Sequence, residues 1–175
     1  MRIEKVFEKN SYEYYKYSPT LLKPFYINLE KLTFKRRIRL IFAFFAGYSV
    51  YYLVKSGKYI GYCLVQSGKD RRYKFATEED IIVGPYYINE EYRGKKLSIE
   101  LLNYILKHSE LEFECAYDYI SKDNLPSIKA SEAVGFKYMS DAKISKYSRA
   151  LNLCEKCEGD YLVFKFQNRF SNTII

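Results

Sequence analysis

The chain has 175 residues, of which 48% are hydrophobic and 29% charged, a composition typical of a folded domain and unlike that of a disordered chain. This length fits one domain, so we expect residues 1–175 to form a single unit, with residues 1–47 carrying the weakest pattern. All of the 18% aromatic content is tyrosine and phenylalanine, which favour half-buried sheet surfaces. The formal net charge of +8 favours an anionic partner, which could be nucleic acid, a membrane surface or a phosphorylated small molecule.

The N-terminus and the apolar segments indicate where the protein resides. The first ten residues, MRIEKVFEKN, contain no apolar core of signal-peptide length, which argues against secretion by that route. The longest apolar run, Leu40–Ala46, is far shorter than the roughly 20 residues that cross a bilayer. We therefore expect a cytoplasmic protein without a transmembrane segment.

Cysteine and histidine are too few, and too far apart, to predict a metal site. Cys154 and Cys157 form one C-x-x-C pair. A zinc site would require a second such pair or histidines at ligand spacing, and His108 is the only histidine. We expect no metal, reduced thiols, and a His108 that complements the dipole at a helix end. The cysteines are Cys63, Cys115, Cys154 and Cys157.

The first third of the chain carries one helical segment. The tyrosine-rich stretch NSYEYYKYSP, residues 10–19, has no pattern that assigns it, and residues 29–47 predict one or two helices. A basic cluster precedes the apolar end of this segment, as in a helix that contacts a membrane surface. The alternative that we favour is a helix whose apolar end packs on a sheet. The cluster consists of Lys35, Arg36, Arg37 and Arg39.

From Tyr48 the pattern changes to that of strands. Two β-rich runs are joined by Lys55–Lys58, a hairpin turn with Gly57 where positive φ is required. A third run, residues 81–88, is interrupted by Gly84-Pro85. Because proline cannot donate to a strand ladder, we predict a bulge or a free edge there, where a ligand could pair with exposed backbone.

The second half alternates helices with strands. Residues 97–108 predict a helix with one apolar stripe, and residues 111–120 a strand. A second helix begins at Asp123 or Asn124, with Pro126 in its first turn, and ends at Gly135. Two further strands lie within residues 136–147 and 160–166, joined through the turn CEKCEG. The helical stripe consists of Leu97, Leu101, Leu102, Ile105 and Leu106.

The loop EYRGKKLS, Glu91–Ser98, stands between the interrupted strand and the first of these helices. The first N–H groups of a helix are unpaired and the helix dipole is positive there, so such a loop can hold a phosphate. Arg93, Lys95 and Lys96 add positive charge. A plain loop before a solvated helix would have a similar sequence, so the motif depends on its context.

That context resembles the GNAT superfamily of CoA-dependent N-acetyltransferases. The loop is similar to the family's Q/R-x-x-G-x-G/A signature, with Tyr92–Lys95 in its common form. Asn124, with Ser127 three residues on and Gly135-Phe136 eleven residues on, is similar to the N-x-x-S/A segment that ends in G-F. The order of elements is the one that this fold would give, and the resemblance covers roughly residues 48–166.

The resemblance implies an α/β fold of the α+β type, with a mixed, mostly antiparallel, twisted sheet of about six or seven strands flanked by helices. It implies acetyl-CoA as cosubstrate, with the pyrophosphate on the loop and the pantetheine arm along the interrupted strand like an added strand. The cofactor contacts expected from it are Tyr86, Ile88, Arg93, Gly94, Lys95, Lys96, Leu97, Ser98, Asn124 and Ser127.

The sequence departs from the family pattern at three positions. Lys96 replaces a usual glycine, and its side chain disfavours positive φ, while its ammonium could either crowd or contact the phosphate. Ser98 replaces a usual glycine or alanine. Ser131 replaces a frequent tyrosine acid, and because a serine hydroxyl is short and weakly acidic, another group or a water must serve.

Tyr117 and Asp118 are the candidate catalytic residues, on the strand before the Asn124 segment. Because neighbours on a strand face opposite sides, only one of them can point at a given site. The alternative roles are core packing for Tyr117 and a surface or capping carboxylate for Asp118.

These features predict an acetyl-CoA-dependent N-acetyltransferase that acts on the amine of a small molecule, such as an amino sugar or another metabolite. One alternative is a protein or peptide N-acetyltransferase. Another is a GNAT-like module that has lost catalysis and serves in CoA binding or interaction, which Lys96 and Ser131 favour. A nucleic-acid binder is a third, but the basic residues are dispersed and no nucleic-acid-binding motif occurs, so we expect no nucleic-acid partner.

Overall fold

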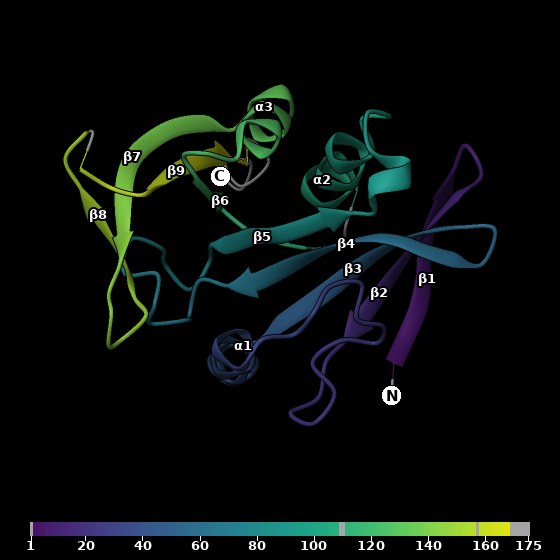
Figure 1. Ribbon diagram of the computed structural model, residues 1–175, viewed down its shortest axis with the longest axis horizontal. Helices are drawn as coiled ribbons and strands as arrows, with labels where there is room; N and C mark the ends of the chain where they lie inside the picture. Colours follow the sequence, from purple (N-terminus) through teal and green to yellow (C-terminus); the bar gives the residue numbers. More distant parts are fainter. Residues whose placement is uncertain (1, 109–110, 157, 169–175) are drawn as a thin grey trace, which may run out of the picture.

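The computed structural model describes residues 2–108, 111–156 and 158–168. Within them the chain forms one nine-stranded sheet, three α-helices and a short 3-10 helix, Glu90–Tyr92 (Figure 1). The strands are β1 (Arg2–Lys9), β2 (Tyr12–Ser18), β3 (Tyr48–Lys55), β4 (Lys58–Ser67), β5 (Ile81–Ile88), β6 (Cys115–Ser121), β7 (Lys137–Ile144), β8 (Leu151–Cys154) and β9 (Tyr161–Gln167). The helices are α1 (Phe34–Ala46), α2 (Leu97–Lys107) and α3 (Leu125–Ala133).

The sheet confirms the predicted α+β class. Its strand order is β1-β2-β3-β4-β5-β6-β9-β7-β8, and every neighbouring pair is antiparallel except β5 and β6, which are parallel. Among the described residues the sheet has nine strands where six or seven were expected. The strands that sequence patterns missed are β1, β2 and β8.

The missed N-terminal hairpin places tyrosines on both faces of the sheet. Tyr14 of β2 packs in the core beneath α2, whereas Tyr17 packs in the core beneath α1. Both side chains are buried. A strand with large aromatic side chains on both faces has no apolar and polar alternation, which is why its sequence carries no strand signal.

Helix α1 is one helix, capped at both ends. The Thr33 hydroxyl accepts the N–H of Arg36, and the chain leaves the helix at Gly47 with φ of 98°. Leu40 and Ala43 are buried against the sheet, as expected for packing, but Phe45 faces outward and is 77% exposed. In the part of the chain that is described, no helix has the length and apolar character needed to cross a membrane.

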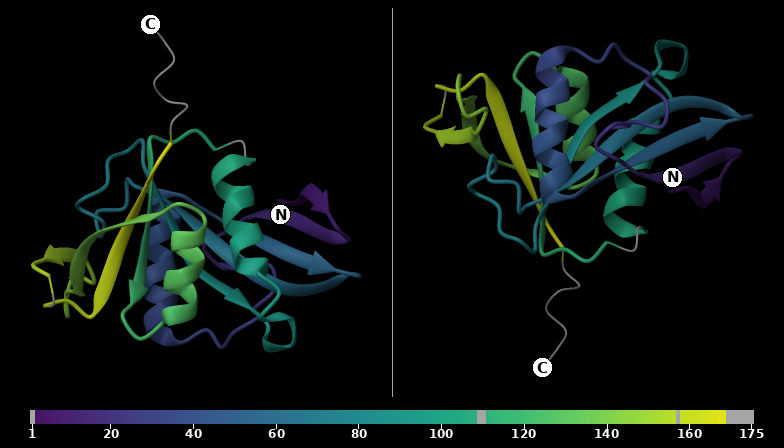
Figure 2. Two further views of the ribbon diagram at one scale, coloured as in Figure 1. Left: turned by 90° about the horizontal axis from the view of Figure 1, so that it is seen from above. Right: turned by 90° about the horizontal axis from the view of Figure 1, so that it is seen from below.

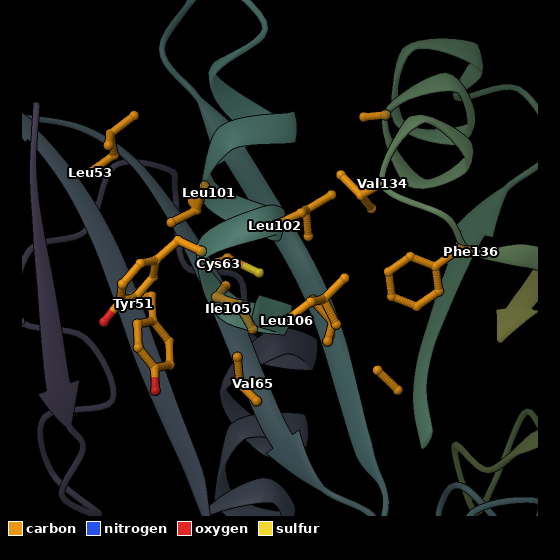
Figure 3. Close-up of a cluster of buried hydrophobic side chains, with 14 of the residues drawn as sticks. Tyr51, Leu53, Cys63, Val65, Leu101, Leu102, Ile105, Leu106, Val134 and Phe136 are labelled. Carbon is orange, nitrogen blue, oxygen red and sulfur yellow. The ribbon is translucent and has the colours of Figure 1, made fainter. Parts of the chain in front are cut away.

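The helices divide between the two faces of the sheet. Helices α2 and α3 lie side by side on one face and α1 covers the other, as the two views of Figure 2 show. The predicted apolar stripe of α2 is buried against the sheet, where Leu101 and Ile105 point toward Cys63 and Val65 of β4 (Figure 3). Phe136, just after α3, closes the same cluster.

Strand β5 is bulged where the sequence predicted an interruption. Val65 of β4 pairs with Val83, but the next paired residues are Cys63 and Tyr86, so Gly84 and Pro85 together oppose one residue of β4. Gly84 has φ of 110°, a conformation that favours glycine, and its bond to Pro85 is cis. The predicted hairpin turn between β3 and β4 is also present, with Gly57 at φ of 75°.

Candidate active site

Strands β5 and β6 separate just before the bulge and leave an opening in the sheet. Their parallel pairing is limited to Ile81 with Ala116 and Ile82 with Tyr117. Beyond the bulge, the Asn89 N–H donates to Ile60 of β4 at 2.8 Å. Because donors alternate along a strand, the backbone groups of residues 86 and 88 face away from β4, into the opening. A ligand could pair with such an edge as an added strand.

The basic loop forms the mouth of this opening at the N-terminus of α2. Gly94 and Lys96 both adopt left-handed conformations, with φ of 77° and 59°. Lys96 thus adopts a backbone conformation that favours glycine. No side chain caps α2, which starts at Leu97, and its first N–H groups have no partner within the helix. Ser98 lies half-buried in that first turn.

Arg93 fixes this loop to β5. Its Nε donates to the Ile88 carbonyl at 3.0 Å, and its guanidinium lies 5.6 Å from the centroid of the Tyr87 ring and 3.4 Å from a Glu90 carboxylate oxygen. The charge of Arg93 is therefore partly compensated. Lys95 and Lys96 are exposed and, among the described residues, pair with no carboxylate.

Asp118 lies at the base of the opening, where β5 and β6 part. Its carboxylate accepts the Ser131 hydroxyl at 2.5 Å, and Oδ1 is 3.3 Å from where a Cβ on Gly84 would stand. Only 2% of its surface is exposed. This burial raises the pKa of Asp118 to about 7, although hydrogen bonds from Ser131 and from the Tyr119 N–H offset part of the effect. Asp118 is neither a surface carboxylate nor a helix cap.

Tyr86 extends this cluster across the opening to α3. Its phenol donates to the Ser127 carbonyl at 2.9 Å and lies within hydrogen-bonding reach of the Ser131 hydroxyl. Burial, followed by the charge of Asp118, raises the pKa of Tyr86. Sequence reasoning placed only the backbone of Tyr86 at the site. The missed signal is the bulge. Its extra residue changes the alternation along β5, so that a different set of side chains, including that of Tyr86, faces α3.

Of the other predicted site residues, Tyr117 lies away from the cluster and Asn124 lies at the start of α3. Tyr117 lies on the opposite face of β6 from Asp118, with its ring centroid 5.1 Å from that of Phe75, so the structure does not bring these two catalytic candidates together. Asn124 caps α3 as predicted, since its side chain accepts the Ser127 N–H at 3.3 Å.

The cysteines and the histidine lie apart from this cluster, except for Cys63. Its thiol is fully buried near Asp118, and burial raises its pKa well above the usual range. Cys115 is buried in β6, Cys154 ends β8, and Cys157 lies outside the described residues. His108 ends α2 and stacks on Phe7, with ring centroids 5.9 Å apart. Among the described residues, no three histidine, cysteine, aspartate or glutamate side chains come together as metal ligands.

A mostly antiparallel sheet that opens between two parallel strands, beside a helix whose N-terminus is preceded by a basic glycine loop, defines an acyl-CoA-type transferase architecture. Residues 14–136, more than half of the chain, match the family model of the Acetyltransferase (GNAT) family. The chain therefore belongs to the GNAT family and is a GNAT acetyltransferase, a family that uses acetyl-CoA. No curated protein matches it.

Solved structures have the same fold. A GNAT-family protein from Desulfovibrio desulfuricans is 14% identical, with a TM-score of 0.56 over 79% of this chain and 85% of that chain. An acetyltransferase from Thermus thermophilus is 15% identical, with a TM-score of 0.55 over 79% and 77%. The protein yncA of Salmonella typhimurium, solved with its cofactor acetyl-CoA, is 18% identical, with a TM-score of 0.53 over 76% and 72%.

Proposed function

We propose that the protein transfers the acetyl group of acetyl-CoA to the amine of a small molecule, such as an amino sugar or another metabolite. The observation that carries this proposal is the joint position of Asp118, Tyr86 and Ser131 at the base of the opening between β5 and β6. Asp118 and Tyr86 supply titratable groups at this position, and the Ser131 hydroxyl lies between them within hydrogen-bonding reach of both. This favours an enzyme over a module that only binds CoA, despite the missing tyrosine at position 131.

The residues around the opening fit the cofactor. In our proposal the pantetheine arm pairs with the backbone of residues 86 and 88. At residue 88 the carbonyl already accepts the Arg93 Nε–H, so the backbone N–H is the group left to bind the arm. The pyrophosphate binds the first N–H groups of α2 and the exposed Lys95 and Lys96. The surroundings of Gly94 leave room for the pyrophosphate. No atom lies within 4 Å of the point where a Cβ on Gly94 would stand, so the loop backbone is open to a ligand.

The chain's own residues then manage the protons. Bound acetyl-CoA supplies a thioester carbonyl that an amine can attack. Asp118, with a pKa of about 7, is a proton acceptor matched to neutral pH, and it takes the proton that the ammonium of the acceptor must lose. Tyr86, a phenol that is protonated at neutral pH and is held by the Ser127 carbonyl, is the proton donor in place of the tyrosine that Ser131 replaces. Tyr117 keeps a packing role on the other face.

The test of this function is release of CoA thiol from acetyl-CoA in the presence of amino sugars, polyamines and short peptides. We expect turnover with at least one class of small amine and none with peptides. Calorimetry with CoA accompanies the assay. Binding of CoA without turnover on any amine would contradict the enzyme proposal, and a preference for peptides would favour a protein N-acetyltransferase.

Lys96 permits a separate test of the cofactor loop. Both Lys96→Ala and Lys96→Gly remove an ammonium that we place on the pyrophosphate, so each is expected to weaken CoA binding about fivefold in calorimetry. Glycine also relieves the left-handed backbone at this position, so the glycine variant should be about 1 kcal/mol more stable than the alanine variant in urea unfolding. Tighter CoA binding by Lys96→Gly would mean instead that the lysine crowds the phosphate.

A further inference from the structure

A strongly basic cavity of about 290 Å³ lies on the α1 face of the sheet. Its walls come from α1, from β4 to β6, and from the segments before β5 and β8. Among the described residues that line it there are five cationic side chains and no aspartate or glutamate. The cations are Lys35, Arg36, Arg39, Arg72 and Arg149.

Two of these cations are neutralised by partners outside the cavity lining. Arg36 pairs with Glu30 at 3.1 Å, and Arg72 donates through Nε to Asp70 at 2.9 Å in a buried ion pair.

The other three have no carboxylate partner within the described chain, although Arg39 contacts the hydroxyls of Tyr119 and Tyr73. Lys35, Arg39 and Arg149 thus bring like charges to one cavity, an arrangement that a bound anion stabilises.

The cavity borders the candidate active site at the bulge of β5. Pro85 lines the cavity, while the adjacent Gly84 lies beside Asp118 on the other face of the sheet. Gln66, which also lines the cavity, donates to the Gly84 carbonyl at 2.8 Å and accepts the Tyr73 hydroxyl at 3.3 Å. The wall of the cavity is therefore hydrogen-bonded to the bulge itself.

We propose that this cavity holds the acceptor, whose amine reaches Asp118 through the opening between β5 and β6, and that the acceptor is a small amine carrying a phosphate or a carboxylate. Arg39 and Arg149 hold the oxyanion, because guanidinium groups bind oxyanions through paired hydrogen bonds, and Lys35 adds charge at the rim. The volume suits a small metabolite, and the positive potential disfavours polyamines. This inference rests on the proposed acetyltransferase function and specifies its substrate class.

The test compares amines that differ only in the anion. Glucosamine 6-phosphate is paired with glucosamine, and phosphoethanolamine with ethanolamine, for the phosphate arm; glycine is paired with glycinamide for the carboxylate arm. In one of the two arms we expect kcat/KM to be at least tenfold higher for the anionic amine than for its neutral counterpart. The arm that shows this difference tells whether the cavity binds a phosphate or a carboxylate. Arg149→Gln should raise KM for that anionic amine about tenfold and leave KM for its neutral counterpart unchanged. Arg71→Gln, an exposed arginine outside the cavity lining, is the matched control and should change neither.

The outcomes separate this inference from the acetyltransferase proposal. Turnover with equal kcat/KM for both members of every pair overturns the anionic substrate class and leaves the enzyme standing. If no amine is turned over, calorimetry with glucosamine 6-phosphate, phosphoethanolamine and glycine decides. Binding of any of them that Arg149→Gln weakens and Arg71→Gln does not supports the cavity alone, and binding of none overturns it.

Discussion

Tyr86→Phe is expected to lower kcat about 100-fold, the usual effect of removing a general acid, while the affinity for CoA changes little. The phenylalanine ring retains the packing of Tyr86, and the substitution removes the hydroxyl that donates to the Ser127 carbonyl and faces Ser131. The measurement is steady-state release of CoA thiol with a saturating amine, together with calorimetry for CoA.

Tyr17→Phe is the matched control. Its hydroxyl also donates to a main-chain carbonyl, that of Lys23 at 2.8 Å, but Tyr17 lies beneath α1 in a different core cluster. Each variant should lose about 1 kcal/mol of unfolding free energy with its hydrogen bond. A difference in kcat between the two variants therefore cannot result from a difference in stability. An equal fall of kcat in both variants would contradict a proton-donor role for Tyr86.

Asp118→Asn is expected to abolish most turnover and to flatten the pH dependence of stability. The folded state raises the pKa of Asp118 from 3.8 to about 7, so it holds a proton that the unfolded chain releases. Between these values the folded state binds more protons, and stability therefore falls as pH rises, by on the order of 3 kcal/mol from pH 5 to pH 8. Asparagine does not titrate, so this contribution disappears. Urea unfolding at the two pH values measures the slope, and thiol release at pH 8 should fall about 100-fold.

Asp80→Asn provides the control for a buried aspartate. Asp80 accepts the Thr77 N–H and hydroxyl on one oxygen and the Cys115 N–H on the other, at 2.8, 3.0 and 3.0 Å. An amide cannot accept at both ends, so this variant should lose stability at both pH values while keeping the wild-type slope. A wild-type slope in Asp118→Asn would show that the buried carboxylate is not what titrates.

Local rules in the sequence predicted the helices and turns near the site. Asn124 and Gly135 bound α3 where capping preferences place them, and Gly57 and Gly84 occupy backbone conformations that favour glycine. The interruption of β5 was predictable because proline cannot pair within a ladder. Each of these features depends on one or two residues and their immediate neighbours.

Features that depend on two faces or on distant segments were not predictable. Strand β2 places tyrosines in both core clusters and shows no alternation, and β8 has only four residues, too few to show a period. The position of the Tyr86 phenol depends on the residue count of the bulge. The basic cavity assembles Lys35, Arg39 and Arg149 from segments far apart in the chain, which no local spacing relates.

The hydrogen-bonded contact between Tyr86, Ser131 and Asp118 constrains how this site can change during evolution. Ser131 has no exposed surface, and the Tyr86 phenol lies within hydrogen-bonding reach of its hydroxyl. A tyrosine at position 131 would overpack this site unless residue 86 became small. A small side chain at position 86 would in turn leave the buried hydroxyl of Ser131 facing a void. The phenol of this site therefore moves between strand and helix only through paired substitutions, and each single intermediate is less stable than either end point.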